Sequence, residues 1–264
     1  MTELTLTSGF IQTREHNAVL HVTLDRADKL NALNVAMYED LTAAVQHLAA
    51  RDDLNALLIT ANGRSYCAGN DIQDFLQADP ASRDDGKLSP AMVLIHALMA
   101  LDKPVIMAVQ GNATGIGTTM LLHCDLIYVA QNARLKMPFV NLGLCPEAGS
   151  SFLLPRLLGH PRAAELLLLG EEISGTRACE IGLANQALPA GQAVLDAARA
   201  AALRIAELPP SSVQLTKRLI RSGVSRTADE VMETEGEHFA QLLSGAEAKE
   251  ALTAFMEKRK PVFN

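Results

Sequence analysis

The sequence lacks the cysteine spacing of a metal site or of a disulfide framework. Its 264 residues include four cysteines, with no C-x-x-C pair and no paired histidine pattern. They are Cys67, Cys124, Cys145 and Cys179. We therefore expect buried, reduced thiols in a cytosolic protein, with no bound metal.

The sequence also lacks an excess of positive charge and any long apolar run. Its formal net charge is −7, which argues against nucleic-acid binding but leaves room for a local basic pocket for a phosphorylated small molecule. No apolar stretch is long enough to span a bilayer, and no N-terminal apolar targeting segment is present. The chain ends Pro-Val-Phe-Asn264, without the peroxisomal Ser-Lys-Leu signal. We expect a cytoplasmic protein with no membrane partner.

Short apolar strands alternate with helical patterns through most of the chain, which indicates an α/β fold. The predicted strands are 18–24, 56–61, 104–109, 125–130 and 134–137. The predicted helices are one that follows an Asn34 N-cap, then 91–101 and 117–123. The leucine run 166–169 is short and flanked by glutamates, so we expect a core helix there.

The pattern changes after Pro209-Pro210, where only helices are predicted. These helices cover 213–221, 228–243 and 247–258. We therefore predict an α/β core over residues 1–208 and a helical region over 209–264. The apolar faces of that region must be buried on the core or on another subunit.

Two glycine-containing segments, 63–72 and 110–120, each follow a predicted buried strand. Small residues let a ligand approach the backbone, and a helix N-terminus stabilises negative charge. Each segment alone also fits an ordinary strand-to-helix turn, and Gly115-Ile-Gly117 is an incomplete dinucleotide fingerprint. Together, the segments could each direct one backbone N–H at a single oxygen, forming an oxyanion hole.

Glu147 is a carboxylate in an otherwise apolar segment. The neighbouring apolar residues are Leu142, Leu144, Phe152, Leu153 and Leu154. Apolar walls would raise the pKa of the carboxyl group, which suits proton transfer near neutral pH. The alternative is a carboxylate in the first turn of a helix, stabilised by the helix dipole.

Four motifs in order along the chain resemble the crotonase (enoyl-CoA hydratase/isomerase) superfamily. They are Arg26-Ala-Asp-Lys-Leu-Asn-Ala-Leu33, Cys67-Ala-Gly-Asn-Asp-Ile72, Gly111-Asn-Ala-Thr-Gly-Ile-Gly117, and Pro138 followed by Pro146-Glu-Ala-Gly149. The resemblance covers essentially the whole chain. It implies a spiral of repeated ββα units with two nearly perpendicular sheets. It also implies a C-terminal helical layer that assembles homotrimers, or hexamers built as dimers of trimers.

The resemblance also assigns site residues for an acyl-CoA substrate. The backbone N–H groups of Ala68 and Ile116 would form the oxyanion hole. The implied CoA or substrate contacts are Arg26, Lys29, Asn70, Asp71, Ile72, Phe139, Phe255 and Lys258. Without the resemblance, Arg26, Lys29 and Lys258 fit solvated charges, and Phe255 fits a core residue.

Departures from the family pattern predict the reaction. The two glutamates with which hydratases of the superfamily activate water fall on Thr119 and Phe139, which cannot act as acids or bases near neutral pH. Glu147 instead matches the glutamate of peroxisome-type Δ3,Δ2-enoyl-CoA isomerases. This implies a 1,3-proton transfer on a CoA thioester in fatty-acid β-oxidation, with no metal or redox cofactor.

Two other functions are compatible with parts of the sequence, and a third is disfavoured. An enoyl-CoA hydratase would need Thr119 or Asn141 to help Glu147 position water. A non-catalytic acyl-CoA-binding protein would share Asn70, Asp71 and Ile72 but would not need Glu147. RNA binding, found in one branch of the superfamily, conflicts with the net charge. His123 and His160 are expected to be structural, because no serine elbow accompanies them.

Overall fold

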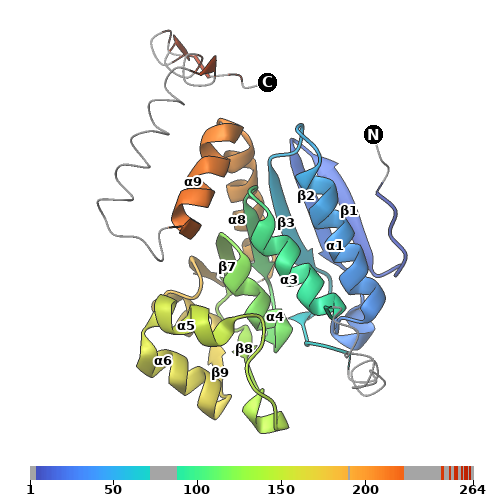
Figure 1. The fold of residues 1–264 in the computed structure, drawn as a ribbon, viewed down its shortest axis with the longest axis vertical. Helices are drawn as coiled ribbons and strands as arrows, with labels where there is room; N and C mark the ends of the chain where they lie inside the picture. Colours follow the sequence, from blue (N-terminus) through green and yellow to red (C-terminus); the bar gives the residue numbers. More distant parts are fainter. Residues whose placement is uncertain are drawn as a thin grey trace.

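The computed structural model describes residues 4–71, 88–189 and 191–222, together with residues 245, 246, 250, 253, 254, 257, 259, 260 and 262. Ile72, Phe255, Lys258 and the predicted helix 228–243 lie outside the described residues. Figure 1 shows two sheets with helices packed around them.

The larger sheet has six strands in the order β1-β2-β3-β5-β7-β10. Their bounds are Ile11–His16 (β1), Val19–Leu24 (β2), Ala56–Ala61 (β3), Val105–Val109 (β5), Leu126–Ala130 (β7) and Gln186–Leu188 (β10). β1 and β2 are antiparallel, and the other neighbours are parallel. Every residue of β3 and of β5 is buried, as in a parallel sheet covered on both faces.

The smaller sheet has four strands in the order β4-β6-β8-β9. Their bounds are Ser65–Cys67 (β4), Asn112–Thr114 (β6), Arg134–Lys136 (β8) and Glu172–Ser174 (β9). β4, β6 and β8 pair in parallel, and β9 pairs antiparallel to β8.

The helices cover both faces of the larger sheet (Figure 1). The longer ones are Val35–Ala49 (α1), Pro90–Ala100 (α3), Ser150–Leu158 (α5), Gly191–Ala206 (α8) and Pro210–Ser222 (α9). The shorter ones are Ala27–Lys29 (η1), Ile116–Thr119 (α4), Met120–His123 (η3), Val140–Leu142 (η4), His160–Ala164 (α6), Glu165–Leu169 (η5) and Gly175–Glu180 (α7). α1 and α3 pack together on one face, and α8 crosses β3, β5 and β7 on the other. No helix among the described residues is both long and apolar enough to cross a membrane.

The chain repeats one path: a strand in the larger sheet, a strand in the smaller sheet, then a helix. The repeats are β3-β4-α3, β5-β6-α4 and β7-β8-α5. This confirms the predicted α/β spiral of ββα units. Because β4 and β6 are parallel neighbours, the loops that follow them leave the sheet side by side.

Most of the predicted elements have their observed counterparts within a residue or two. Asn34 caps α1, because its side chain accepts a hydrogen bond from the Met37 N–H at 2.9 Å. The leucine run 166–169 is helical as predicted; Leu166 and Leu167 belong to the core, whereas Leu168 is 71% exposed, so only one face of this helix is a core face. The four thiols are free, but only Cys67 is buried; Cys124 and Cys179 are half-buried and Cys145 is exposed, contrary to the expected burial.

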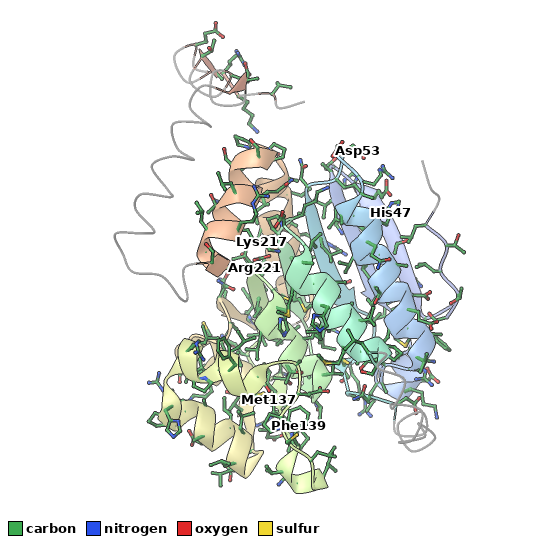
Figure 2. All side chains as sticks on the ribbon, viewed as in Figure 1. His47, Asp53, Met137, Phe139, Lys217 and Arg221 are labelled. Atoms are coloured by element: carbon green, nitrogen blue, oxygen red, sulfur yellow. The ribbon has the colours of Figure 1, made fainter. Side chains whose placement is uncertain are left out.

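Two cationic side chains anchor α9 to the core (Figure 2). The Lys217 Nζ lies 2.6 Å from the Lys103 carbonyl oxygen and 2.7 Å from an Asp125 carboxylate oxygen. The Arg221 Nη1 donates to the carbonyl groups of Met99 and Leu101, where α3 ends. α9 begins at Pro210, where the composition changes. The domain boundary and the oligomerising role of 209–264 remain predictions.

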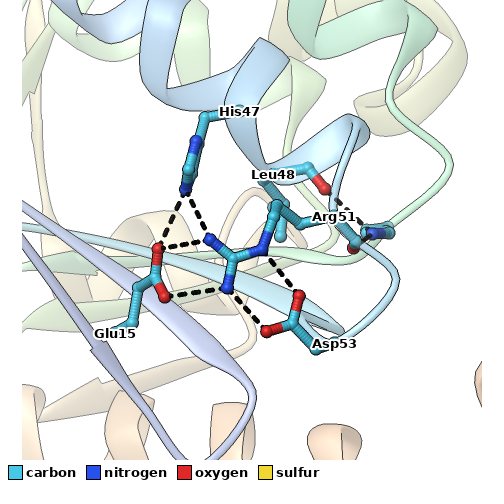
Figure 3. Close-up of polar contacts among 6 residues, drawn as sticks. Glu15, His47, Leu48, Arg51 and Asp53 are labelled. Atoms are coloured by element: carbon cyan, nitrogen blue, oxygen red, sulfur yellow. Dashed lines mark hydrogen bonds and ion pairs between the residues drawn. The ribbon is translucent and has the colours of Figure 1, made fainter. Parts of the chain in front are cut away.

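A surface ion-pair cluster joins the end of α1 to β1 (Figure 3). Arg51 binds Glu15 at 3.1 Å and Asp53 at 2.6 Å, and His47 lies 2.9 Å from Glu15. The hydrogen bond from Arg51 lowers the pKa of Asp53 to about 2. This cluster links the turn between α1 and β3 to β1.

Candidate active site

Two loops meet at the carboxyl ends of β4 and β6, where Cys67 is the strand partner of Ala113. Gly69 has φ +103°, and a Cβ there would lie 3.1 Å from the Thr114 carbonyl oxygen. A Cβ on Gly117 would lie 2.7 Å from the Cys67 carbonyl oxygen. Each loop therefore needs its glycine because the backbone of the other loop is in contact with it.

The Ala68 N–H, the first predicted donor, already has a partner within the protein. The Ala68 N–H donates to the Leu30 carbonyl group at 3.1 Å, so the prediction that it faces an oxyanion was wrong. Leu30 and Asn31 both have positive φ, and this turn brings the Leu30 carbonyl group to Ala68. A register that depends on a distant turn cannot be read from the Ala-Gly-Asn-Asp motif.

The Asn70 N–H is the alternative candidate in this loop. Leu33 bonds to the residues on either side of Asn70. The Leu33 N–H donates to the Gly69 carbonyl oxygen at 2.8 Å, and the Asp71 N–H donates to the Leu33 carbonyl oxygen at 2.9 Å. Successive N–H groups of an extended segment point to opposite sides, so the Asn70 N–H points away from Leu33. In the part of the chain that the structure describes, this N–H has no acceptor.

Ile116, the second predicted donor, lies at the start of α4. The preceding Gly115 N–H donates to the Lys136 carbonyl group at 2.9 Å. The Ile116 and Gly117 N–H groups have no acceptor among the described residues, as is normal in the first turn of a helix. They are available to an oxygen placed beside the loop that contains Asn70.

The Glu147 carboxylate lies against α4. The Thr119 Oγ1 donates to its Oε1 at 3.3 Å. Burial raises the pKa of Glu147, and the bond from Thr119 opposes that rise. Burial also raises the pKa of Cys67 to about 12, and the nearby Glu147 charge adds to this rise. The carboxylate therefore lies close to the end of β4 and to α4, beside both loops.

A left-handed turn follows Glu147. Ala148 has φ +50°, Gly149 has φ +67°, and α5 begins at Ser150. The Glu147 carbonyl group accepts hydrogen bonds from the Ser150 N–H at 2.9 Å and its Oγ at 2.7 Å. Glu147 thus precedes the helix, and the alternative of a first-turn carboxylate was wrong.

Most of the apolar side chains predicted to wall Glu147 are exposed. Leu142 is 68% exposed and Phe152 is 52% exposed, and Leu144 is exposed as well, although Leu154 is buried. The groups that the structure brings near the carboxylate come from distant segments, namely Thr119, Cys67 and Tyr38. The raised pKa was predicted correctly, but its cause is tertiary packing.

Arg26 and Asp71 bind each other and do not offer free charges. The Arg26 Nη1 lies 2.7 Å from the Asp71 Oδ2 and 3.0 Å from the Ala32 carbonyl oxygen. The Arg26 side chain is only 12% exposed, and its contact with the CoA phosphates stays a prediction. Lys29 is exposed at the end of η1, and its phosphate contact stays a prediction.

The sequence prediction missed two residues that hold the first loop. Asn31 is fully buried; its Nδ2 donates to the Asn62 carbonyl group at 2.8 Å and the Ser65 carbonyl group at 2.9 Å. The Tyr38 hydroxyl donates to the Asn70 Oδ1. Asn31 carried a usable signal, because asparagine tolerates positive φ better than most residues. Tyr38 lies in the ordinary apolar face of α1 and carried none.

Phe139, Asn141 and Thr119 are the remaining candidate residues. Phe139 is 7% exposed and lies just after β8 (Figure 2). The Asn141 Nδ2 donates to the Leu169 carbonyl group at 3.4 Å, so this amide is directed at η5 and not at Glu147. Of the two residues proposed to help position water, the structure brings only Thr119 to the carboxylate.

Comparisons with known proteins agree with this geometry. The family described as Enoyl-CoA hydratase/isomerase matches residues 14–264. The 1,2-epoxyphenylacetyl-CoA isomerase of Escherichia coli is 35% identical over 259 residues, 96% of this chain and 98% of that protein. The short-chain-enoyl-CoA hydratase of Clostridium acetobutylicum is 32% identical, over 90% of this chain and 91% of that protein. The solved structure of Pseudomonas aeruginosa OdaA has a TM-score of 0.78 at 48% identity, over 94% and 99% of the two chains.

Proposed function

The chain belongs to the enoyl-CoA hydratase/isomerase family of acyl-CoA enzymes, and within it we propose that this protein is a Δ3,Δ2-enoyl-CoA isomerase. One observation carries the proposal. The hydrogen-bond partner of the Glu147 carboxylate is the Thr119 hydroxyl, with no second carboxylate bonded to it among the described residues. A single base can move a proton, whereas hydration needs water to be held and activated as well.

In the proposed mechanism, the thioester carbonyl oxygen of a 3-enoyl-CoA accepts hydrogen bonds from the Asn70 and Ile116 N–H groups. Negative charge grows on this oxygen as the enolate forms, and each such donor contributes roughly 10²–10³ in rate. Glu147 removes a proton from C2, the double bond shifts toward C2, and the same carboxyl group returns a proton to C4. The product is the conjugated trans-2-enoyl-CoA, and no water is consumed.

The environment of Glu147 suits removal of a proton from C2. Burial raises its pKa, so the carboxylate is a stronger base than an exposed glutamate. A non-catalytic acyl-CoA-binding protein would gain nothing from a carboxylate that is costly to bury. The half-buried carboxylate therefore favours catalysis over binding alone.

Hydration is the second candidate function, and one contact favours it. The Thr119 hydroxyl touches the Glu147 carboxylate, and a water molecule could bridge the two groups. The relatives also differ in reaction, since one is named an isomerase and another a hydratase. Family membership therefore leaves the choice to experiment.

Two assays with purified protein distinguish the reactions. With 3-hexenoyl-CoA, an isomerase produces conjugated-thioester absorbance; with crotonyl-CoA, a hydratase removes it. We expect turnover of the first substrate to exceed that of the second by at least about tenfold. Rapid loss of crotonyl-CoA without isomerisation would overturn the proposal. A third reaction with 1,2-epoxyphenylacetyl-CoA, followed by mass spectrometry, tests the activity named for the Escherichia coli relative.

A further inference from the structure

His123 is a buried histidine that the proposed mechanism does not use. It is 7% exposed at the end of η3, and its Nε2 lies 2.8 Å from the Ala148 carbonyl oxygen. A carbonyl group only accepts hydrogen bonds, so Nε2 carries the proton and donates it. The contact joins η3 to the backbone immediately after Glu147.

The backbone at this contact needs support. Ala148 has φ +50°, a conformation that the Cβ atom of a non-glycine residue disfavours. Ala148 is only 4% exposed, so this residue is packed inside the protein. A hydrogen bond to the carbonyl group of the strained residue is a direct way to hold it.

His123 is also connected to the rest of the site through one continuous segment. α4 and η3 together run from Ile116 to His123. The segment begins with the N–H proposed for the oxyanion, continues with the hydroxyl that binds Glu147, and ends with the imidazole. The proposed oxyanion donor and the base are thus both attached to the same segment.

The surroundings of His123 keep the ring neutral. Burial lowers its pKa, as do Arg221 from α9 and His96 from α3, while the bond to Ala148 raises it. A neutral ring with Nε2 protonated retains the hydrogen bond at neutral pH.

We infer that His123 is a positioning residue for Glu147, whose Nε2–H holds the Ala148 carbonyl group and so maintains the left-handed turn that directs the carboxylate at the substrate. This inference rests on the proposed function, because it assigns a role toward the base of that reaction. Misplacing a base by about 1 Å costs about 10²-fold in rate.

The test compares a variant that lacks the donor with one that retains it. His123→Met fills similar space without an N–H, whereas His123→Gln offers an amide N–H at similar reach. We expect H123M to lower kcat about 10- to 100-fold with KM changed less than about threefold, and H123Q to keep most of the wild-type kcat. His160→Gln, at an exposed histidine, is the matched control and should behave like wild type.

A second substitution separates positioning from simple packing. Glycine adopts positive φ without strain, so Ala148→Gly added to H123M should recover part of the lost kcat. If His123 only filled space, Ala148→Gly would give no recovery. Wild-type kcat in folded H123M would overturn the inference. If H123M does not fold, His123→Asn, whose amide is too short to reach, replaces it and should lose at least about tenfold relative to H123Q.

Crystal structures of the wild type and H123M give a readout that does not depend on turnover. We expect residue 148 to leave the positive-φ region, or the Glu147 carboxylate to move, in H123M. An unchanged turn in H123M would overturn the inference even if the wild type is an active isomerase. An inactive wild type whose turn does depend on His123 would instead overturn the proposed function alone.

Discussion

The strands β3 and β5 and the loops after β4 and β6 are built on different principles. β3 and β5 are buried at every residue and pair in unbroken register. β4 and β6 have three residues each, their register shifts between Ser65 and Cys67, and the loops that follow contain backbone at positive φ. The first region obtains its stability from apolar burial. The second brings backbone N–H groups that are unpaired among the described residues and a half-buried carboxylate into one region, which apolar burial alone would not favour.

The comparison teaches where substitutions should affect stability and where they should affect chemistry. In the larger sheet, the chemical identity of a buried side chain matters mainly through its volume. Around the loops, single hydrogen bonds and missing Cβ atoms decide which groups face the substrate. Substitutions in the two regions should therefore separate loss of folding from loss of turnover.

The largest expected effect is at the base. Glu147→Gln keeps the shape of the side chain but cannot remove a proton at C2, so isomerase kcat should fall at least about 10³-fold. Acyl-CoA binding, measured by calorimetry, should change less than about threefold. Retained turnover in this variant would show that the chemistry does not depend on Glu147.

A substitution in the larger sheet should lower the stability of the protein and leave its turnover nearly unchanged. Leu57 in β3 is fully buried, and Leu57→Ala should lower the free energy of unfolding by about 2–5 kcal/mol through the cavity it leaves. The kcat of the folded fraction should stay within about twofold of wild type. Denaturant unfolding and turnover at low temperature check both parts, and a large drop in kcat would weaken the division between the two regions.

Gly117 should show how closely the loops must approach. A Cβ there meets the Cys67 carbonyl oxygen at 2.7 Å, so Gly117→Ala must push the two loops apart. We expect kcat/KM to fall about 10²-fold, because displaced donors lose much of their effect. Gly191→Ala is the control, since the nearest atom to its added Cβ is 3.6 Å away. Equal activities of these two variants would contradict the crowding argument.

Thr119→Val should have a smaller effect, mainly on pH dependence. The Thr119 bond lowers the pKa of Glu147, so its loss should raise that pKa further. The base acts when ionised, so the acidic limb of the kcat/KM profile should move to higher pH, while the rate at alkaline pH stays within several-fold. A limb that moves to lower pH would contradict the assigned hydrogen bond.

The smallest expected effect is on stability. A carboxyl group whose pKa is raised by folding destabilises the folded state above that pKa, and the penalty disappears as the pH falls toward the unfolded value. Glu147→Gln should therefore raise the thermal midpoint at pH 8 and have little effect near pH 4.5. Melting curves at the two pH values test the sign. A lower midpoint at pH 8 would mean that the carboxylate is stabilised by partners.

Local pattern predicted the elements better than it predicted the site. The apolar run of β3 and the Asn34 cap of α1 depend on neighbouring residues, so both were readable. The choice between Ala68 and Asn70 depends on the carbonyl group of Leu30, which only the folded turn brings near. Likewise Arg26 is basic in the sequence, but its partner Asp71 lies 45 residues away.

The sequence by itself determined the α/β class, the two glycine loops and Glu147 as the candidate base, and the spiral followed from the resemblance of its motifs to a known family. Periodicity, glycine and a carboxylate in an apolar segment are local properties, so they can be read from the chain. Only the tertiary structure decided which N–H groups are available, which cations are neutralised, and what surrounds Glu147. Those outcomes depend on contacts between distant segments, since hydrogen-bond register and burial are set by packing.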